Sequence, residues 1–393
     1  MYSSILLTCV HSDISTVVRF IAPSKAPKSR TPEIDSNFEP FSNVIISNDE
    51  QIEVYTLFTF PGRNKKYSDF IWHWYHFDGI DYDEKTHRNT IFLFDHKSWD
   101  QEVDDENGNY DYLMGTDLDF SNEETVQEVT SWLHWYLDIT HIKGLRLDAV
   151  KHIPAYFYQE LLPKLRQDYQ EELFTVGEYW HGDVYHLENY LKEVNFEMSL
   201  FDVPLHYHFY DASHSENYDM SHIFDQTLVS MYPSNAVTFV DNHDTEPSQS
   251  LASYIPDEFK GQAYCLILLR KEGYPCVFYG DLEGIEYENI SSKKAILQKI
   301  MSLRKEYNNG YQDDYFDHPH LIGWTRHDEF KSMAVVLTNS TGGIKSMYVG
   351  KNFSNCYFVN VFNSSQRVCI NEEGYGDFYC EDKNFAVYVK EQS

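Results

Sequence analysis

Three acidic residues each follow a short apolar run, far apart along the chain. Asp148 ends GLRLD, Glu178 ends LFTVGE, and Asp244 ends TFVDNHD. A carboxylic acid can protonate a leaving oxygen while a carboxylate attacks the carbon that this oxygen leaves, and the acid can then turn into a base. This is the inventory that glycoside hydrolysis needs. The acids can cooperate only if separate elements present them at one place.

An arginine accompanies one of these acids. Arg146 lies two residues before Asp148, so both side chains lie on the same face of a strand. The guanidinium can therefore hold Asp148 as the anion, as a nucleophile requires. The acid of such a pair needs a raised pKa, which partial desolvation and nearby negative charge would supply.

The elements that must position these residues alternate between strands and helices. Apolar strand patterns at 144–150, 173–180, 236–244 and 276–281 are separated by helical patterns. This alternation predicts βαβ units in a parallel sheet, and a (β/α)8 TIM barrel carries its active site at the carboxyl ends of its strands. In many barrels, however, an acidic residue after a strand only begins a solvated loop. Carboxylates at strand ends are therefore modest evidence for catalysis when taken alone.

Capping signals refine the helices. The segment 121–140 predicts a helix with Ser121 as N-cap and Glu124 completing a capping box. A further helix is expected at about 258–271. The texture of the sequence changes along the chain and indicates four segments: one without a clear catalytic pattern (1–30), an acidic, β-rich inserted segment (31–120), the alternating strands and helices of the barrel (121–311), and a C-terminal β-sandwich of antiparallel strands (312–393).

Charge and cysteine content exclude several classes of protein. The formal net charge of -31 opposes nucleic acid and anionic membranes as partners, and it suits a neutral substrate and a cation. The six cysteines form no CxxC pair, so we expect neither a disulfide framework nor a zinc site. We recognise neither a secretory signal nor a membrane-spanning run, and we therefore expect a cytoplasmic protein. We also expect a monomer.

Three strings resemble conserved regions of glycoside hydrolase family 13, and within it the bacterial liquefying type of α-amylase. They are GLRLDAVKH (144–152), VGEYW (176–180) and FVDNHD (239–244), in the family's order. The resemblance implies that Asp148 is the nucleophile, Glu178 the acid/base and Asp244 the transition-state-stabilising carboxylate. It implies internal, retaining cleavage of α-1,4-glucans such as starch or glycogen.

The same resemblance extends to substrate contacts. It implies that Arg146 supports the site and that His243 hydrogen-bonds the sugar at the cleavage subsite. Lys151 and His152 match the pair that lines the leaving-group side. Trp180 and Tyr110 are candidates for stacking on sugar rings, and packing is an equal alternative for both.

Oxygen donors in the inserted region suggest calcium. Asp111 and Asp117, with the backbone carbonyl of His152, resemble the family's structural calcium site. Three more aspartates resemble the additional metal cluster of the liquefying subgroup: Asp78, Asp100 and Asp119. Ca²⁺ takes six to eight oxygen ligands and tolerates irregular geometry. A solvated acidic face is the alternative, and the asparagine ligand expected upstream is not found.

The family's first conserved region is also not found in residues 1–40. We therefore expect an incomplete barrel that lacks strands one to three because of an N-terminal truncation or a frameshift. We expect the loss of these strands to impair activity. The alternatives are an inactive glucan-binding remnant and a related α-glucan hydrolase or transglycosylase. The intact triad argues against the first, and the long insert argues for an endo-acting amylase.

Overall fold

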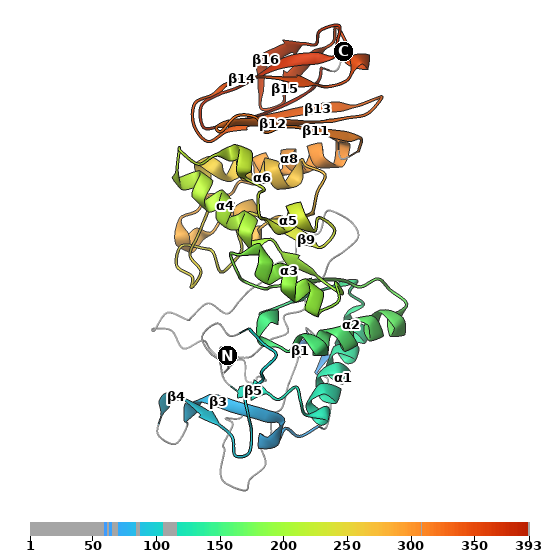
Figure 1. Ribbon diagram of the computed structural model, residues 1–393, viewed down its shortest axis with the longest axis vertical. Coiled ribbons are helices and arrows are strands. Elements are labelled where there is room, and N and C mark those ends of the chain that lie inside the picture. Colours follow the sequence, from blue (N-terminus) through green and yellow to red (C-terminus); the bar gives the residue numbers. More distant parts are fainter. Residues whose placement is uncertain are drawn as a thin grey trace. The chain divides into compact units, whose positions relative to one another are not determined.

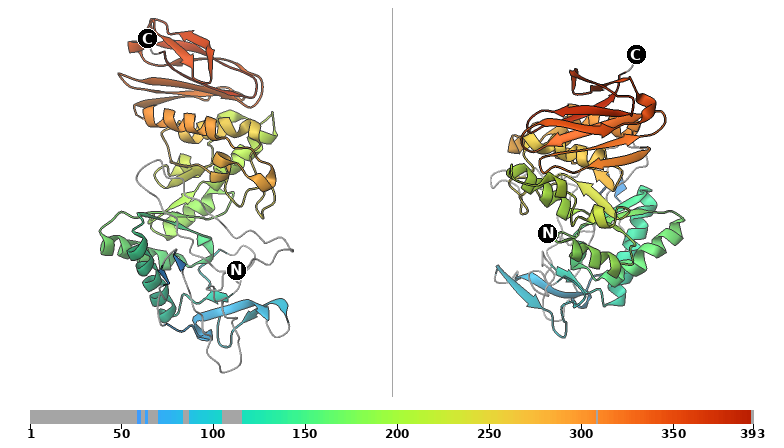
Figure 2. Two further views of the ribbon diagram at one scale, coloured as in Figure 1. Left: turned by 180° about the vertical axis from the view of Figure 1, so that it is seen from behind. Right: turned by 45° about the horizontal axis from the view of Figure 1, so that its top comes forward.

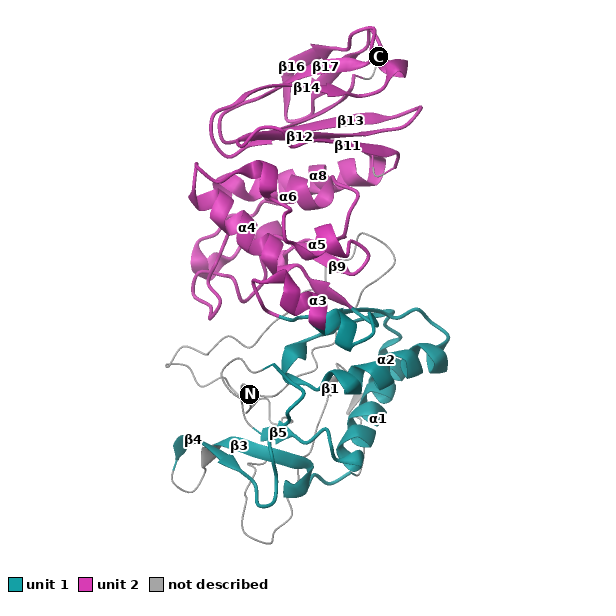
Figure 3. Cartoon of the chain, viewed as in Figure 1, with its two compact units in different colours: residues 1–179, 190–198 teal, residues 180–189, 199–393 magenta. Residues whose placement is uncertain are grey.

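The computed structural model describes residues 59–60, 63–64, 70–83, 87–104, 116–307 and 309–391. The chain divides into two compact units (Figure 3). One comprises residues 1–179 and 190–198, and the other comprises residues 180–189 and 199–393. The segment 1–30, Tyr110 and Asp111 lie outside the described residues.

A small antiparallel sheet lies in the first unit. Its strand order is β4 (Arg88–Leu93), β3 (Phe77–Asp83), β5 (Thr116–Leu118), with Phe77 opposite Leu118. The short 3₁₀ helix η1 (Trp74–His76) leads into β3, and β1 (Thr59–Phe60) pairs with β2 (Arg63–Asn64). These strands belong to the segment that the sequence indicated as β-rich (Figure 1).

The first unit also contains two helices and two parallel strands. In chain order they are α1 (Glu123–Thr140), β6 (Gly144–Leu147), η2 (Val150–His152), α2 (Ala155–Tyr169) and β7 (Phe174–Gly177). Strands β6 and β7 pair in parallel, as the βαβ pattern predicted. Val129, Leu133 and Leu137 form the buried stripe of α1, at the four-residue spacing of one helix face.

The predicted cap of α1 was wrong by one residue. Asn122, not Ser121, is the N-cap: its side-chain oxygen accepts from the backbone N–H groups of Glu124 and Thr125. Ser121 instead donates its hydroxyl and its backbone N–H to Asp119. Glu124 lies 2.9 Å from the imidazole of His76 rather than reaching back to a cap.

Three more parallel strands lie in the second unit, where β8 (Ser199–Phe201) pairs with β9 (Ala236–Phe239) and β9 pairs with β10 (Tyr274–Cys276). All four residues of β9 are buried, as expected for a parallel strand covered on both faces. The remaining elements before residue 308 are α3 (Val184–Glu193, which straddles the division), α4 (Val203–His214), η3 (Met220–His222), α5 (Leu228–Met231), α6 (Asp257–Leu268), α7 (Tyr279–Glu283), η4 (Glu286–Glu288) and α8 (Lys294–Tyr307). The strand expected at 276–281 is shorter and earlier than predicted, because α7 begins at Tyr279.

The C-terminal strands are antiparallel, as predicted. One sheet has the order β11 (Tyr311–Tyr315), β12 (Leu321–His327), β13 (Ser332–Thr338), β18 (Phe385–Lys390), β15 (Tyr357–Asn360), β16 (Asn363–Cys369), and a second pairs β14 (Gly343–Tyr348) with β17 (Tyr375–Cys380). Phe358, Phe378 and Tyr388 lie in the buried core of this region. The segment boundaries predicted at residues 30, 120 and 311 stay predictions.

Helix α6 packs against these strands (Figures 1 and 2). A side chain at Gly261 would place its Cβ 2.2 Å from the ring of Phe385, so only glycine permits this close approach. Gln262 donates from its side chain to the carbonyl of Lys383 at 3.0 Å. Helix α6 is thus held from the sheet side while its other face meets the strand-end loops of the second unit.

Candidate functional site

The pairing of β6 with β7 brings Asp148 and Glu178 to the same strand end. Leu147 lies opposite Gly177, and the two acids are the next residues along each strand. Beyond the strands, the N–H of Glu178 donates to the carbonyl of Leu147 at 2.9 Å. The N–H of Val150 donates to the carbonyl of Glu178 at 3.1 Å. These backbone hydrogen bonds therefore fix the main-chain positions from which the side chains of Asp148 and Glu178 extend.

Arg146 contacts both acids. Its Nη1 donates to Oδ1 of Asp148, and its Nη2 lies 2.9 Å from Oε2 of Glu178. The side chain of Arg146 is 9% exposed, that of Glu178 10%, and that of Asp148 32%. The arginine was expected to pair with Asp148, and this contact is present. Its second contact, with Glu178, is one that the sequence did not indicate.

A sharp turn follows Asp148. Ala149 adopts a left-handed conformation (φ 45°, ψ 42°), which is uncommon for a residue with a side chain. The turn leads into η2, which carries Lys151 and His152, and Lys151 is buried. Both predicted leaving-group-side residues therefore lie directly beyond the end of β6.

Two residues that sequence reasoning missed attach a neighbouring loop to these strand ends. The N–H of Asp104 donates to the carbonyl of Lys151 at 3.0 Å, and the hydroxyl of Tyr179 donates to the Asp104 carboxylate. Tyr179 follows Glu178 directly. Only its position beside the acid in VGEYW could have drawn attention to it.

The third acid, Asp244, lies in the second unit on a tight turn after β9. The side-chain oxygen of Asn242 accepts from the N–H of Asp244 at 2.9 Å and from that of Thr245 at 3.0 Å. Nε2 of His243 lies 3.2 Å from Oδ2 of Asp244, and about a third of each side chain is exposed (37% and 31%). Two hydrogen bonds thus hold the backbone of the turn, and the side chains of His243 and Asp244 are accessible from outside.

Trp180 is half-buried among residues of the second unit. Its indole N–H donates to the hydroxyl of Tyr207 at 3.0 Å, and its ring contacts those of His206 and Phe239. These contacts are packing contacts, and its role in sugar stacking stays a prediction. Tyr110, the other stacking candidate, lies outside the described residues.

The predicted calcium ligands gather around the small sheet of the first unit. Asp78 lies on β3, Asp117 lies on the adjacent β5, Asp119 follows β5, and Asp100 lies in the loop after β4. Asp78, Asp117 and Asp119 are buried. Among the described residues, Oδ2 of Asp78 and Oδ2 of Asp117 are buried with no hydrogen-bond partner. Lys97 is ion-paired with Asp119.

These carboxylates raise one another's pKa. Burial, together with the charges of the neighbouring aspartates, raises the pKa of Asp117 to about 8 and that of Asp78 to about 7. The pKa of Asp100 rises to about 6 for the same reasons. The pKa of Asp119 is lowered despite its burial, because Lys97 and Ser121 donate hydrogen bonds to it. Among the described residues, the cluster thus brings four interacting carboxyl groups together.

The fit to a metal ion is incomplete in the part of the chain that the structure describes. No group of three or more His, Cys, Asp or Glu side chains there is arranged to hold a metal ion. Two buried carboxylate oxygens nevertheless lack a hydrogen-bond partner there. A hard cation such as Ca²⁺ would stabilise them, whereas neutral surroundings would not. Asp111 lies outside the described residues, and His152, whose carbonyl was the expected ligand, lies in η2.

Comparison with known proteins decides the family. Residues 50–324 match the model of the α-amylase catalytic domain. The chain belongs to the α-amylase family. It is 45% identical over 357 residues to an α-amylase of Bacillus licheniformis, covering 88% of this chain and 70% of that relative. It is 47% identical to an α-amylase of Geobacillus stearothermophilus, covering 88% of this chain and 65% of that relative.

Another relative and two solved structures agree. A cytoplasmic α-amylase of Escherichia coli (strain K12) is 39% identical, with 88% of this chain and 74% of that relative covered. An Anoxybacillus α-amylase structure has a TM-score of 0.59 at 20% identity, over 75% of this chain and 70% of that one. The Geobacillus thermoleovorans α-amylase complexed with acarbose has a TM-score of 0.56 at 20% identity, over 71% of this chain and 66% of that one.

These findings confirm the predicted fold class and enzyme class. The chain has the α/β barrel fold of the α-amylase catalytic domain, with an antiparallel C-terminal region, and it is a glycoside hydrolase of the α-amylase type. The prediction that barrel strands one to three are missing stays a prediction, because residues 1–58 lie outside the described residues. Among the described helices, none combines the length and the apolar character needed to cross a membrane.

Proposed function

We propose that this chain cleaves internal α-1,4 bonds of starch- or glycogen-type glucans with retention of anomeric configuration. Asp148 is the nucleophile, Glu178 the acid/base and Asp244 the stabiliser of the positively charged transition state. The observation that carries the proposal is the contact of one guanidinium, that of Arg146, with both Asp148 and Glu178. Two carboxyl groups that share one arginine lie close enough to act on one glycosidic bond.

The two acids differ in environment, and this difference supports their division of labour. Asp148 is the more exposed acid, and the guanidinium of Arg146 donates a charge-assisted hydrogen bond to it. Glu178 is almost fully buried, and burial favours the protonated form of a carboxylic acid. In the first step Glu178 protonates the leaving oxygen while Asp148 bonds to the anomeric carbon.

The second step reverses these roles. Glu178, now a carboxylate, takes a proton from water, and the water oxygen replaces Asp148 on the anomeric carbon. Nη2 of Arg146, 2.9 Å from Oε2, keeps the Glu178 carboxyl group in place between the steps. Asp244 faces the oxocarbenium-like charge in both transition states, and His243 beside it donates to the sugar.

The remaining substrate contacts belong to the same proposal. Lys151 and His152 line the side where the leaving chain departs, and their place directly after the β6 turn supports this. Trp180 and Tyr110 stack on sugar rings. The substrate is uncharged, which agrees with a chain of net charge -31.

We propose that calcium binds the aspartates of the inserted region: Asp78, Asp100, Asp111, Asp117 and Asp119, with the backbone carbonyl of His152. The two buried carboxylate oxygens without partners support a bound cation, as do the pKa values of Asp78 and Asp117, which burial and neighbouring carboxylates raise. The ion would neutralise this charge and hold the small sheet beside the η2 turn.

We place the protein, as a monomer, in the cytoplasm. Four cysteines among the described residues carry free thiols: Cys265, Cys356, Cys369 and Cys380. Unpaired cysteines suit a reducing compartment. A cytoplasmic α-amylase is among the relatives of the chain.

The experiment follows the anomeric proton of the first product by NMR while purified protein hydrolyses a maltooligosaccharide. The α-anomer should appear first and mutarotate afterwards, and Asp148→Asn should abolish product. An early β-anomer would exclude the retaining mechanism. Glucan binding without any product would favour a binding remnant instead.

A further inference from the structure

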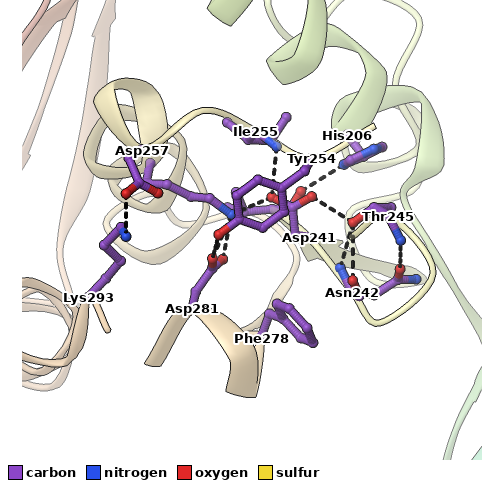
Figure 4. Close-up of polar contacts among 12 residues, drawn as sticks. His206, Asp241, Asn242, Thr245, Tyr254, Ile255, Asp257, Phe278, Asp281 and Lys293 are labelled. Carbon is purple, nitrogen blue, oxygen red and sulfur yellow. Dashed lines mark hydrogen bonds and ion pairs between the residues drawn. The ribbon is translucent and has the colours of Figure 1, made fainter. Parts of the chain in front are cut away.

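A buried aspartate holds the turn that carries His243 and Asp244 (Figure 4). Asp241 directly follows Val240, beyond the end of β9, and is buried. Its Oδ1 accepts the hydroxyl hydrogen of Thr245 at 2.6 Å, and that hydroxyl in turn accepts from the N–H of Asn242 at 3.1 Å. Asp241 therefore closes the turn on its buried side, whereas the side chains of His243 and Asp244 are partly exposed.

A lysine from another element holds Asp241. Lys260 of α6 is 2% exposed, and its Nζ lies 2.5 Å from Oδ2 of Asp241. The same oxygen accepts from the N–H of Ile255 at 3.2 Å. Both oxygens of Asp241 thus have partners, and the strongest is an ammonium group that cannot reach water.

The ammonium of Lys260 has a second anionic partner. Its Nζ lies 2.6 Å from Oδ1 and 2.8 Å from Oδ2 of Asp281 on α7, and 3.8 Å from the centre of the Tyr254 ring. The hydroxyl groups of Tyr254 and Tyr264 also donate to Asp281, at 2.8 Å and 2.6 Å. Asp281 on α7 therefore holds the ammonium group of Lys260 on one side, and the same ammonium group pairs with Asp241 on the other side.

Such a network is costly as a stabilising device. Taking two carboxylates and one ammonium out of water costs several kcal/mol per ion, and buried ion pairs can often be replaced by apolar side chains without loss. Stability alone therefore gives little reason for a lysine at position 260, in a helix whose residues from Phe259 to Leu268 are all buried. A better reason is the contact of Lys260 with Asp241, which closes the turn that carries Asp244.

We propose that Lys260 is a positioning residue that fixes the Asp244-bearing turn through Asp241 and the hydroxyl of Thr245. The inference rests on the proposed role of Asp244 in the transition state. Without the ammonium, Asp241 loses its main partner, the hydroxyl of Thr245 loses a fixed acceptor, and the turn samples other conformations. A shift of about 1 Å in a catalytic group costs about 100-fold in rate.

The first test compares Lys260→Met with two controls in the full chain. Tyr264→Phe removes a hydrogen bond from the far side of the same network and leaves the contact between Lys260 and Asp241 in place. Lys293→Met breaks the ion pair of Lys293 with Asp257 at the start of α6. Asp244→Asn is the benchmark for loss of the proposed stabilising charge.

Lys260→Met should lower kcat about 100-fold and change KM by less than about 3-fold, since the turn acts in the transition state. Tyr264→Phe should lower Tm and Lys293→Met should change little, and both should keep kcat within about 3-fold. A folded Lys260→Met variant with unchanged kcat would overturn the inference. So would an equal loss of kcat in Tyr264→Phe, because general destabilisation would then be the cause.

A readout that does not depend on activity is amide hydrogen exchange. Lys260→Met should raise exchange in peptides covering 241–246, where the N–H groups of Asp244 and Thr245 are bonded, and leave α8 unchanged. Equal acceleration in α8 would indicate a structural role only and overturn the inference.

A second variant covers the case in which Lys260→Met does not fold. Thr245→Val keeps the shape of the side chain and removes only the hydroxyl that links Asp241 to the turn. It should lower kcat as Lys260→Met would, and full activity would overturn the inference. If Asp244→Asn is itself fully active, the proposed function fails. If Asp244→Asn is inactive and Thr245→Val is not, only the positioning role fails.

Discussion

Nη2 of Arg146 lies 2.9 Å from Oε2 of Glu178, while Nη1 of the same guanidinium donates to Asp148. One buried cation therefore contacts both acids to which the proposed mechanism gives different roles. The arrangement fixes the proposed nucleophile and the proposed acid relative to one another. A planar guanidinium can make both contacts at once, whereas the compact ammonium group of a lysine cannot reproduce this geometry.

Arg146→Lys should therefore retain positive charge near Asp148 and lose the simultaneous contact with Glu178. We expect kcat/KM for a maltooligosaccharide to fall about 100-fold or more, measured by reducing-sugar release. The matched control is Arg166→Lys, since Arg166 also bonds a glutamate, Glu197, but does so from α2. That variant should lose stability without losing kcat. Equal activity of Arg146→Lys and wild type would remove the shared-arginine argument.

Metal removal should destabilise the first unit. If calcium is present at about 100 times its dissociation constant, it stabilises the folded state by about 2.7 kcal/mol. In a folding unit of the size of the first one, this stabilisation corresponds to a Tm shift of about 5 °C. EDTA should lower Tm by this amount, and added calcium should restore it.

Asp117→Asn should make Tm insensitive to both EDTA and calcium, because Asp117 supplies a buried oxygen without a partner among the described residues. Asp168→Asn, on the exposed side of α2, should behave as wild type does. A Tm that EDTA leaves unchanged would contradict the calcium proposal.

His206 should make the protein less stable in acid. Its ring is buried, with Nδ1 2.7 Å from the carbonyl of Val240 and Nε2 2.8 Å from the hydroxyl of Ser253. Burial, as the largest cause, lowers the pKa of His206 from 6.5 to about 4. The unfolded chain therefore binds more protons at this site between pH 6.5 and 4, and stability falls as pH decreases through that window.

The contribution of His206 should be on the order of 2 kcal/mol between pH 7 and pH 5. Urea unfolding at both pH values measures it, with His206→Gln as the comparison. The variant should show a smaller difference between the two pH values than wild type. An identical pH dependence in both proteins would show that His206 does not titrate in this way.

The sequence located the two acids of the first unit because their positions follow from a simple rule. A parallel βαβ unit places its strand ends side by side, so Asp148 and Glu178 had to meet if the two runs were neighbouring strands. The pairing of Arg146 with Asp148 followed in the same way from the two-residue period of a strand. The family resemblance then named the roles.

Other features depend on tertiary contacts that a sequence does not display. Ser121 and Asn122 are both good N-cap residues, and only the bond of Ser121 to Asp119 leaves the cap to Asn122. Lys260 lies within a helical pattern, and nothing in that pattern indicates its two buried partners, which lie after β9 and in α7, 19 and 21 residues away. The contact between Arg146 and Glu178 likewise required the strand register.

The most direct test of the account is covalent trapping at Asp148. In Glu178→Gln, an activated α-maltosyl fluoride can still transfer its sugar, because fluoride leaves without a proton. Hydrolysis of the intermediate then lacks its base, so a glycosyl-enzyme should accumulate. Intact-mass spectrometry should show one added maltosyl group, and peptide mapping should locate it on Asp148. A glycosylated residue other than Asp148, or turnover to product without a covalent adduct, would contradict the account.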